Sequence, residues 1–463
     1  MNTITKSKFI FENDVMEFES SISDFTDVCF HEFDEKSKKI KLKKKIEDLI
    51  GGQVVNHSER QAATHPSERG KQCLFDDNAI NKFARKINLK AKQSWLESRF
   101  LTHKKVTLIT LGIGGSFEGP KLLNESIGSS NLSKKIKHYF ITGSDMKEFD
   151  SRVEKLDPKK TFFIVFSKSF TTIETIELFR KATTWSKDHN KFLFITSNPN
   201  EVKKYNCSGK NFDDDSIYTF DKTIGGRYSI WLDAISFIYG DAEFIKGGFL
   251  ADQHILKSDA YFNFVKRLSF TDIWNHNTMK KNSRAVLTYA WPLRSLPNYI
   301  QQLEMESLGK HANPNSEFKK TGQVIFGGYG PTAQHSYFQL MHQGTNQICA
   351  DIIASNEDKK RLCYVQAITQ SKLLPNGKHD KEQDDTYAAL LADRDGEKFK
   401  INGNVPLNLF LLNKIDAFSL GYLIATWEYR TFITAAMLEI NPFDQFGVVA
   451  GKIYTSNYLA EKD

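Results

Sequence analysis

A hydroxyl-rich segment follows one of the apolar runs of this 463-residue sequence. It reads S-K-S-F-T-T over 167–172, directly after the apolar run 161–166, and a helical pattern begins at Ile173. Hydroxyls, backbone N–H groups and the positive end of a helix dipole together bind anions such as phosphate. Taken alone, the segment equally fits a helix-capping loop without a ligand, in which Lys168 is simply solvated. The candidate anion-binding residues are Ser167, Lys168, Ser169 and Thr172.

A glycine-rich turn, GIGGS over 112–116, follows an earlier apolar run, and a helical pattern follows it from Pro120. Three glycines let a ligand approach the backbone closely, so Gly115 and Ser116 are candidates for contacts with a sugar or a phosphate. A dinucleotide fingerprint would need glycine where the sequence has Phe117, so a nicotinamide cofactor is not expected. The alternative is a plain tight turn.

The best candidate for a general base lies in the segment QQLEMESLGK, 301–310. If this segment is helical, Gln302 and Glu306 share one face, while Glu304 points to the other side and is expected to face water. A single carboxylate beside a neutral amide suits proton abstraction. The spacing also fits an ordinary amphipathic helix.

Three further segments hold groups that suit acid–base chemistry. Arg227 follows two glycines in GGRYSIW, where a fixed guanidinium would stabilise a developing oxyanion or form a structural salt bridge. His335 is expected in the first turn of a helix that opens near Thr332, where the helix dipole favours neutral imidazole. Gln445 and Lys452 are seven residues apart and would share a helix face.

The elements that must hold these groups are strands alternating with helices. Apolar, β-branched runs at 106–111, 136–142, 161–166 and 191–196 are separated by helical patterns, which predicts parallel βαβ units. Such sheets bind ligands at the carboxyl ends of their strands, where both polar loops lie. We expect a helical N-terminal region over 1–100, a first α/β domain over 101–250 and a second over 251–463, with a break near Gly247–Gly248. Shorter runs at 284–291, 322–328 and 347–353 belong to the second domain, and 407–440 is expected to form buried helices.

Composition limits the possible classes of protein. The formal net charge is +7, a mild excess that fits an anionic substrate. The clearest basic run, 36–45, is expected to be one solvated helix face, with a nucleic-acid-binding arm as the alternative. Five cysteines without a CxxC pair favour a reducing cytosol over a disulfide framework or a zinc site. No apolar signal core or bilayer-spanning run is present, so we expect a cytoplasmic protein with no membrane or nucleic-acid partner.

The order of these motifs resembles the glucose-6-phosphate isomerase family. The resemblance runs from about residue 55 to residue 452. The blocks that carry it are VNHSERQAATHPSER (55–69), GIGGSFEGP (112–120), SKSFTTIET (167–175), GGRYSIW (225–231), LEMESLGK (303–310), AQHSYFQLMHQGT (333–345) and DQFGVVAGK (444–452).

The resemblance implies two sugar-isomerase (SIS) α/β domains, each a parallel sheet flanked by helices, in a homodimer with composite active sites. It implies interconversion of glucose 6-phosphate and fructose 6-phosphate, in glycolysis and gluconeogenesis, through ring opening and a cis-enediol intermediate. No metal or organic cofactor is implied. The implied roles are the phosphate loop for Ser167, Lys168, Ser169 and Thr172, sugar contacts for Gly115, Ser116, Gln302 and Gln445, the base for Glu306, the arginine beside the reacting carbons for Arg227, and ring opening for Lys452 and for His335 of the neighbouring subunit.

Some positions depart from the family pattern. Phe117, Gly328 and Val449 replace residues of the family blocks, and at Gly328 and Val449 the family residue is a glutamate. The chain is also expected to be shorter than most members, with a trimmed N-terminal region. Two alternative functions stay open: an isomerase that also accepts mannose 6-phosphate, and a sugar-phosphate sensor on the same domain that needs no base.

Overall fold

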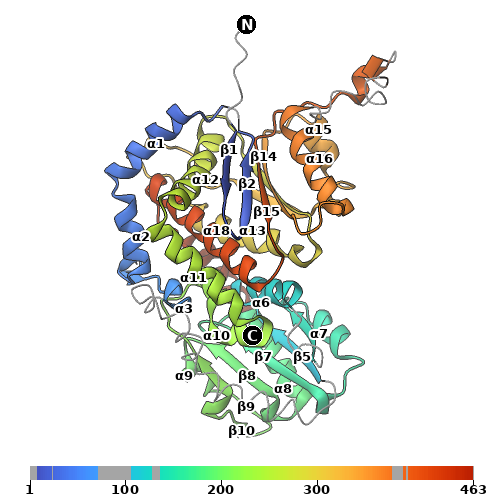
Figure 1. Ribbon diagram of the computed structural model, residues 1–463. Coiled ribbons are helices and arrows are strands. Elements are labelled where there is room, and N and C mark those ends of the chain that lie inside the picture. The colour runs from blue at the N-terminus through green and yellow to red at the C-terminus, as the bar shows by residue number, and fades with distance from the viewer. Residues whose placement is uncertain are drawn as a thin grey trace.

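The computed structural model describes residues 8–22, 24–70, 106–127, 136–377, 389, 391–392 and 395–461. Figure 1 shows two α/β units, each built on a central sheet with helices against it. The four strands predicted for the first unit all form. They lie in a five-stranded parallel sheet of order β11-β8-β7-β5-β6. Its strands are β5 (Val106–Leu111), β6 (Ile136–Ile141), β7 (Thr161–Phe166), β8 (Phe192–Thr196) and β11 (Ile217–Thr219).

The second sheet differs from the prediction because it is mixed. Its order is β1-β2-β15-β14-β12-β13, and β2 runs antiparallel to β15. The N-terminal region, expected to be helical, begins with a hairpin that extends this sheet. The run 407–412, expected to be helical, is a strand that is buried along its whole length. The strands are β1 (Phe9–Glu12), β2 (Met16–Ser20), β12 (Ser283–Thr288), β13 (Val324–Tyr329), β14 (Ile348–Ser355) and β15 (Leu407–Leu412).

Both parallel sets have the same topology. In the first sheet the chain steps from β5 to β6 on one side and returns to β7 on the other, and β12, β13 and β14 repeat this path. Two adjacent strands whose connections leave in opposite directions open a crevice at their carboxyl ends. The loops after β5 and β7 flank that crevice, and these are the two loops predicted to bind a sugar phosphate.

The N-terminal helices run along one side of the molecule (Figure 1). The basic run 36–45 spans a break between α1 (Asp27–Lys39) and α2 (Leu42–Ile50), so it covers two helices rather than one. Lys41 lies at the break in a left-handed conformation, with φ of 54°. Leu42, Ile46 and Leu49 are buried while most of the lysines are exposed, as a solvated face requires. Residues 71–100 of the predicted helical region lie outside the described residues.

Two long helices pack closely at the centre. α11 (Ala242–Lys257) lies along α18 (Ala417–Leu438), whose side chains are almost all buried. A Cβ at Gly247 would lie 1.8 Å from the Phe418 carbonyl oxygen, and one at Gly421 would lie 1.9 Å from that of Phe244. The glycine pair at 247–248 therefore does not mark a break in the chain. It lies inside α11, where it allows the two backbones to touch.

The remaining α-helices, together with the 3-10 helix η5, cover the sheets or connect them. They are α3 (His65–Glu68), α6 (Gly115–Ser126), α7 (Met146–Val153), α8 (Ile173–Ser186), α9 (Pro199–Val202), η5 (Gly226–Trp231), α10 (Asp233–Tyr239), α12 (Asp259–Asn277), α13 (Leu296–Leu308), α14 (Gly330–Ala333), α15 (Phe338–Gln343), α16 (Leu362–Asn376) and α19 (Val449–Ala460). None of the helices in the described ranges is long and apolar enough to cross a membrane.

Candidate active site

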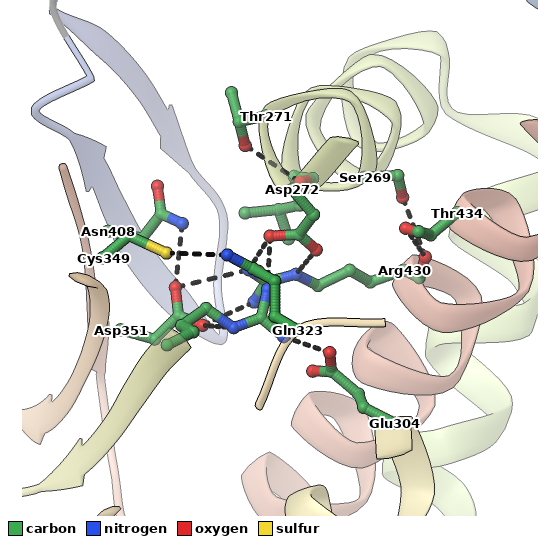
Figure 2. A network of polar contacts seen from close by, with 12 residues as sticks. Ser269, Thr271, Asp272, Glu304, Gln323, Cys349, Asp351, Asn408, Arg430 and Thr434 are labelled. Carbon is green, nitrogen blue, oxygen red and sulfur yellow. Dashed lines mark hydrogen bonds and ion pairs between the residues drawn. The ribbon is translucent and has the colours of Figure 1, made fainter. Parts of the chain in front are cut away.

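The helix that carries Glu306 is anchored by a buried ionic network (Figure 2). Glu304, expected to face water, is only 3% exposed. It accepts hydrogen bonds from Arg284 and, at 2.5 Å, from the indole N–H of Trp427. Three buried carboxylates therefore share two arginines. The members of the network are Asp272, Arg284, Glu304, Asp351 and Arg430. The network fixes the rotation of α13, so that Glu306 points to the opposite, partly exposed side.

Arg227 lies at the centre of the site. All three of its guanidinium nitrogens donate hydrogen bonds to oxygen atoms of the protein. It belongs to the 3-10 helix η5, and its side chain is 2% exposed, against 32% for that of Glu306. Five hydrogen bonds match the five N–H groups that a guanidinium carries. They run from Nε to Ser307 Oγ (2.8 Å), from Nη1 to Glu306 Oε2 (3.1 Å) and Gln445 Oε1 (3.1 Å), and from Nη2 to the carbonyl oxygens of Pro442 (2.5 Å) and Asp444 (3.1 Å).

Glu306 is held from two sides. One carboxylate oxygen accepts from Arg227, and the other accepts from Gln302 Nε2 at 3.1 Å. The two residues therefore share a helix face, as the spacing predicts. Gln302 also reaches the glycine turn, because a Cβ at Gly114 would lie 3.0 Å from its amide nitrogen. Within the described residues the buried Gln302 Oε1 has no hydrogen-bond partner, so it can accept from a ligand.

The segment 441–445 closes the site from the other side. Lys310 donates to the backbone carbonyl of Asp444 and, at 2.8 Å, to its carboxylate. A pocket of about 1030 Å³ lies here, and its lining includes Glu306, Lys310, Asp444 and Gln445. The two predicted loops are not part of that lining. Burial lowers the pKa of Lys310, its bond to Asp444 opposes this, and the nearby Arg227 lowers it further.

The glycine turn after β5 contacts the backbone that carries Arg227. Gly114 has φ of +60°, and α6 begins at Gly115, five residues before the predicted start. A Cβ at Gly115 would lie 2.0 Å from the Gly226 carbonyl oxygen and 2.8 Å from the Arg227 nitrogen. Only glycine allows this contact. Phe117 points elsewhere and packs edge-on against Phe140.

The loop after β7 has the form predicted for it. α8 begins at Ile173, and Thr172 at its N-cap makes no side-chain capping bond. The Lys168 carbonyl accepts three hydrogen bonds of 2.9 Å from Thr196 and Ser197, which fixes the loop against the next strand. Ser167 Oγ accepts from the backbone N–H of Phe170, whose buried ring anchors the turn.

Lys168 connects this loop electrostatically to the centre of the site. Burial lowers the pKa of its ammonium group. The carboxylate of Glu59 opposes that shift, the Arg227 guanidinium adds to it, and Asp221 opposes it. An ammonium and a guanidinium that influence each other provide a positive field for an anion between the loop and Arg227.

The structure does not bring His335 and Lys452 to Glu306 within this chain. His335 is exposed and lies two residues past the end of the short α14, in the turn before α15, rather than in the first turn of a helix. The dipole argument for its neutral form therefore fails. Lys452 lies on α19, none of whose twelve residues is buried.

Comparison with known proteins agrees with this geometry. A family model described as phosphoglucose isomerase matches residues 20–462. The chain belongs to the phosphoglucose isomerase family. A glucose-6-phosphate isomerase from Hydrogenovibrio crunogenus is 32% identical over 470 aligned positions, which cover 91% of this chain and 84% of that protein. The enzyme of the same name from Wigglesworthia glossinidia brevipalpis is 30% identical, over 96% of this chain and 88% of its own.

Solved structures support the fold of a phosphoglucose isomerase. The crystal structure of a glucose-6-phosphate isomerase from Chlamydia trachomatis superposes with a TM-score of 0.76, at 24% identity over 96% of this chain and 89% of that one. A hypothetical protein from Thermus thermophilus gives 0.60, at 19% identity over 86% and 97%. At these identities the likeness concerns the fold, and it agrees with the SIS-type α/β domains inferred from the sequence.

Sequence reasoning missed the residues that hold the site of this family member together. Ser307, Lys310 and Asp444 lie inside the blocks that carry the resemblance, so the signal was present. A serine next to the base, however, looks like any helical serine until its hydroxyl is placed on Arg227. Within the described residues no group of three or more His, Cys, Asp or Glu is arranged to hold a metal ion.

Proposed function

We propose that this chain interconverts glucose 6-phosphate and fructose 6-phosphate, using Glu306 as the base. The observation that carries the proposal is the pair formed by Glu306 and Arg227, a carboxylate held 3.1 Å from a buried guanidinium. The base has one oxygen on Arg227 and the other on Gln302, so its position is fixed before a substrate arrives. Preorganised acid–base and charge-stabilising groups are what enolisation of a sugar needs.

The proposed reaction runs through an open-chain sugar. Glu306 removes the proton from C2 of the aldose, and negative charge develops on the oxygens of a cis-enediol. Glu306 returns the proton to C1, while a second proton moves from O2 to O1, giving the ketose. Arg227 stabilises the charge. All five N–H groups of Arg227 already donate to protein oxygens. The side-chain oxygen of Gln445 must therefore release Nη1 so that this nitrogen can donate to the substrate oxygen.

The phosphate of the substrate is assigned to the loop 167–172. Its hydroxyls, the start of α8 and the Lys168 ammonium suit a dianion, and Ser169 is exposed to receive one. The glycine turn with Gly115 and Ser116 lies against the backbone of Arg227, which supports the assignment of sugar contacts to this turn. Binding energy from the distant phosphate then holds C1 and C2 at the base.

The site is proposed to be completed in a homodimer. α19 exposes several large apolar side chains on a helix that buries none of its residues, among them Ile453, Tyr454, Tyr458 and Leu459. Near His335, α15 and α16 expose Leu340, Leu362 and Val365. Exposed apolar side chains gathered on one helix are typical of an interaction site. A second copy that covers these surfaces would supply His335 to the neighbouring site and bring Lys452 inward, for ring opening.

We assign the reaction to glycolysis and gluconeogenesis in the cytosol, without a metal or cofactor. The test is a coupled assay of the purified protein with fructose 6-phosphate, glucose-6-phosphate dehydrogenase and NADP, in the presence of a chelator. Turnover that resists chelation is expected. Folded protein without turnover would contradict the proposal and favour the sugar-phosphate sensor.

The composite site has a separate test. Glu306→Gln and His335→Ala proteins are unfolded together and refolded as a mixture. If His335 acts across the interface, half of the dimers are mixed and each holds one native site, so about a quarter of wild-type activity returns. No recovery in a mixture that forms dimers would contradict the exchange of His335.

A further inference from the structure

A second polar cluster lies directly beside the proposed catalytic pair, and the proposed reaction gives it no chemical step. Asp444 accepts from Lys310 through both its backbone carbonyl and its carboxylate Oδ1 (2.8 Å for the latter), and its Oδ2 accepts from Ser58 Oγ at 2.7 Å. The side chains of Lys310 and Asp444 are only 15% and 11% exposed. Because the pair is largely buried, removal of either partner would leave the other charge without its counterion.

The segment that contains Asp444 has no regular secondary structure of its own. Residues 441–445 lie between the end of α18 and the turn before α19, and side chains from elsewhere in the chain bond to them. Asn441 Nδ2 donates to Asn56 Oδ1 at 2.8 Å and to Ser58 Oγ at 2.6 Å. Three groups therefore hold this segment: the 56–58 loop, Lys310 and Arg227.

The held segment presents three oxygens to one guanidinium. The carbonyls of Pro442 and Asp444 and the side-chain Oε1 of Gln445 all accept from Arg227. Lys310 lies one helical turn beyond Glu306, just past the end of α13, and it binds the residue directly before Gln445. The end of α13 and the 441–445 segment are therefore linked twice: by Lys310 through Asp444, and by Arg227, which donates to both Glu306 and Gln445.

We propose that Lys310 and Asp444 are positioning residues for Gln445 and, through Arg227, for the base Glu306. The inference rests on the proposed function, in which Glu306 is the base and Gln445 releases Arg227 Nη1 to the substrate oxygen. Without the ion pair, the Asp444 carbonyl and the Gln445 amide lose their fixed place on Arg227. The guanidinium then no longer holds Glu306 in one orientation.

A double-mutant cycle separates positioning from simple structural support. Lys310→Met, Gln445→Ala and the double variant are compared in the coupled assay. We expect Lys310→Met to lower kcat about 10- to 100-fold, as the loss of one charge-assisted contact in a site does, with a smaller change in KM. Because Lys310 acts through Gln445, the double variant should fall within about threefold of the slower single variant.

Two further variants keep the test decisive. Lys310→Arg preserves the charge and is expected to keep at least about a third of wild-type kcat. If the methionine variant fails to fold, Lys310→Arg takes its place in the double-mutant cycle. Lys319→Met removes a lysine that donates to the carbonyls of Pro314 and Ser316 in the following loop but has no contact with Asp444, and it should behave as wild type.

The outcomes distinguish this inference from the proposed function. Wild-type protein without turnover refutes the function itself. If the wild type is active and Lys310→Met leaves kcat unchanged, the positioning role is overturned and the function stays intact. The same conclusion holds if the effects of Lys310→Met and Gln445→Ala on kcat multiply in the double variant.

Discussion

Replacing Arg227 by lysine keeps the charge and removes the fork of donors. The guanidinium makes five hydrogen bonds with protein acceptors, whereas an ammonium has three N–H groups at one point. At least two of the five acceptors then lose their donor. The five include the backbone carbonyls of Pro442 and Asp444. Each buried acceptor left unpaired costs about 1–3 kcal/mol.

Catalysis should suffer as well as stability in the Arg227→Lys protein. Removing one preorganised donor from a developing oxyanion costs about 10²–10³ in kcat. We therefore expect kcat/KM to fall about 10³-fold, equal to about 4 kcal/mol of transition-state stabilisation. The assay is coupled turnover at saturating and limiting fructose 6-phosphate, with unfolding followed in parallel by circular dichroism.

Arg294→Lys is the matched control for this substitution. Arg294 is also ion-paired, to Glu125, but it lies over the exposed Trp291 ring and not beside Glu306. Near-wild-type turnover is expected for the control. If folded Arg227→Lys also stays within tenfold of wild type, the guanidinium is not the group that stabilises the transition state, and the reasoning from its five contacts is wrong.

Three other substitutions test the surrounding structure. Gly115→Ala should reduce turnover by at least about tenfold because its Cβ would overlap the Gly226 carbonyl, whereas Gly226→Ala, with nothing within 4 Å of its Cβ, should stay near wild type in the same assay. Burial lowers the pKa of His138 to about 4, so the unfolded chain takes up a proton between pH 6.5 and 4 that the folded chain does not, and the free energy of unfolding should fall by about 3 kcal/mol over that window. Denaturant titrations should show a flatter pH dependence in His138→Phe, and an unchanged slope would contradict the assignment. Arg284→Met leaves three buried carboxylates to one arginine and should destabilise the fold by about 3–5 kcal/mol in urea unfolding, so a loss below about 1 kcal/mol would contradict the network.

Local sequence signals were sufficient where a residue's role depends on its own element. The strands 106–111 and 161–166 were predicted with their observed ends, because β-branched and aromatic runs bounded by turn residues leave few other structures. The shared face of Gln302 and Glu306 follows from helical spacing alone. The common position of the loops after β5 and β7 also followed, since parallel strands place such loops at one edge, while their role in ligand binding stays a prediction.

Features that depend on partners distant in the chain could not be predicted from the sequence. The run 407–412 is equally apolar as a helix or a strand, and only its pairing with β14 and β2 decides. Glu304 faces the interior because it accepts a hydrogen bond there from Arg284, twenty residues earlier in the chain. No spacing rule reveals such a partner. The close approach at Gly247 similarly depends on α18, some 170 residues later.

The most direct test of the account is turnover by the Glu306→Gln protein. Glutamine keeps the size of the side chain and an oxygen for Arg227 but cannot accept the C2 proton. Loss of a general base costs about 10²–10⁴ in rate, so we expect kcat to fall by that factor while the melting temperature stays near that of wild type. A folded Glu306→Gln protein that retains more than a tenth of wild-type kcat would show that the base lies elsewhere.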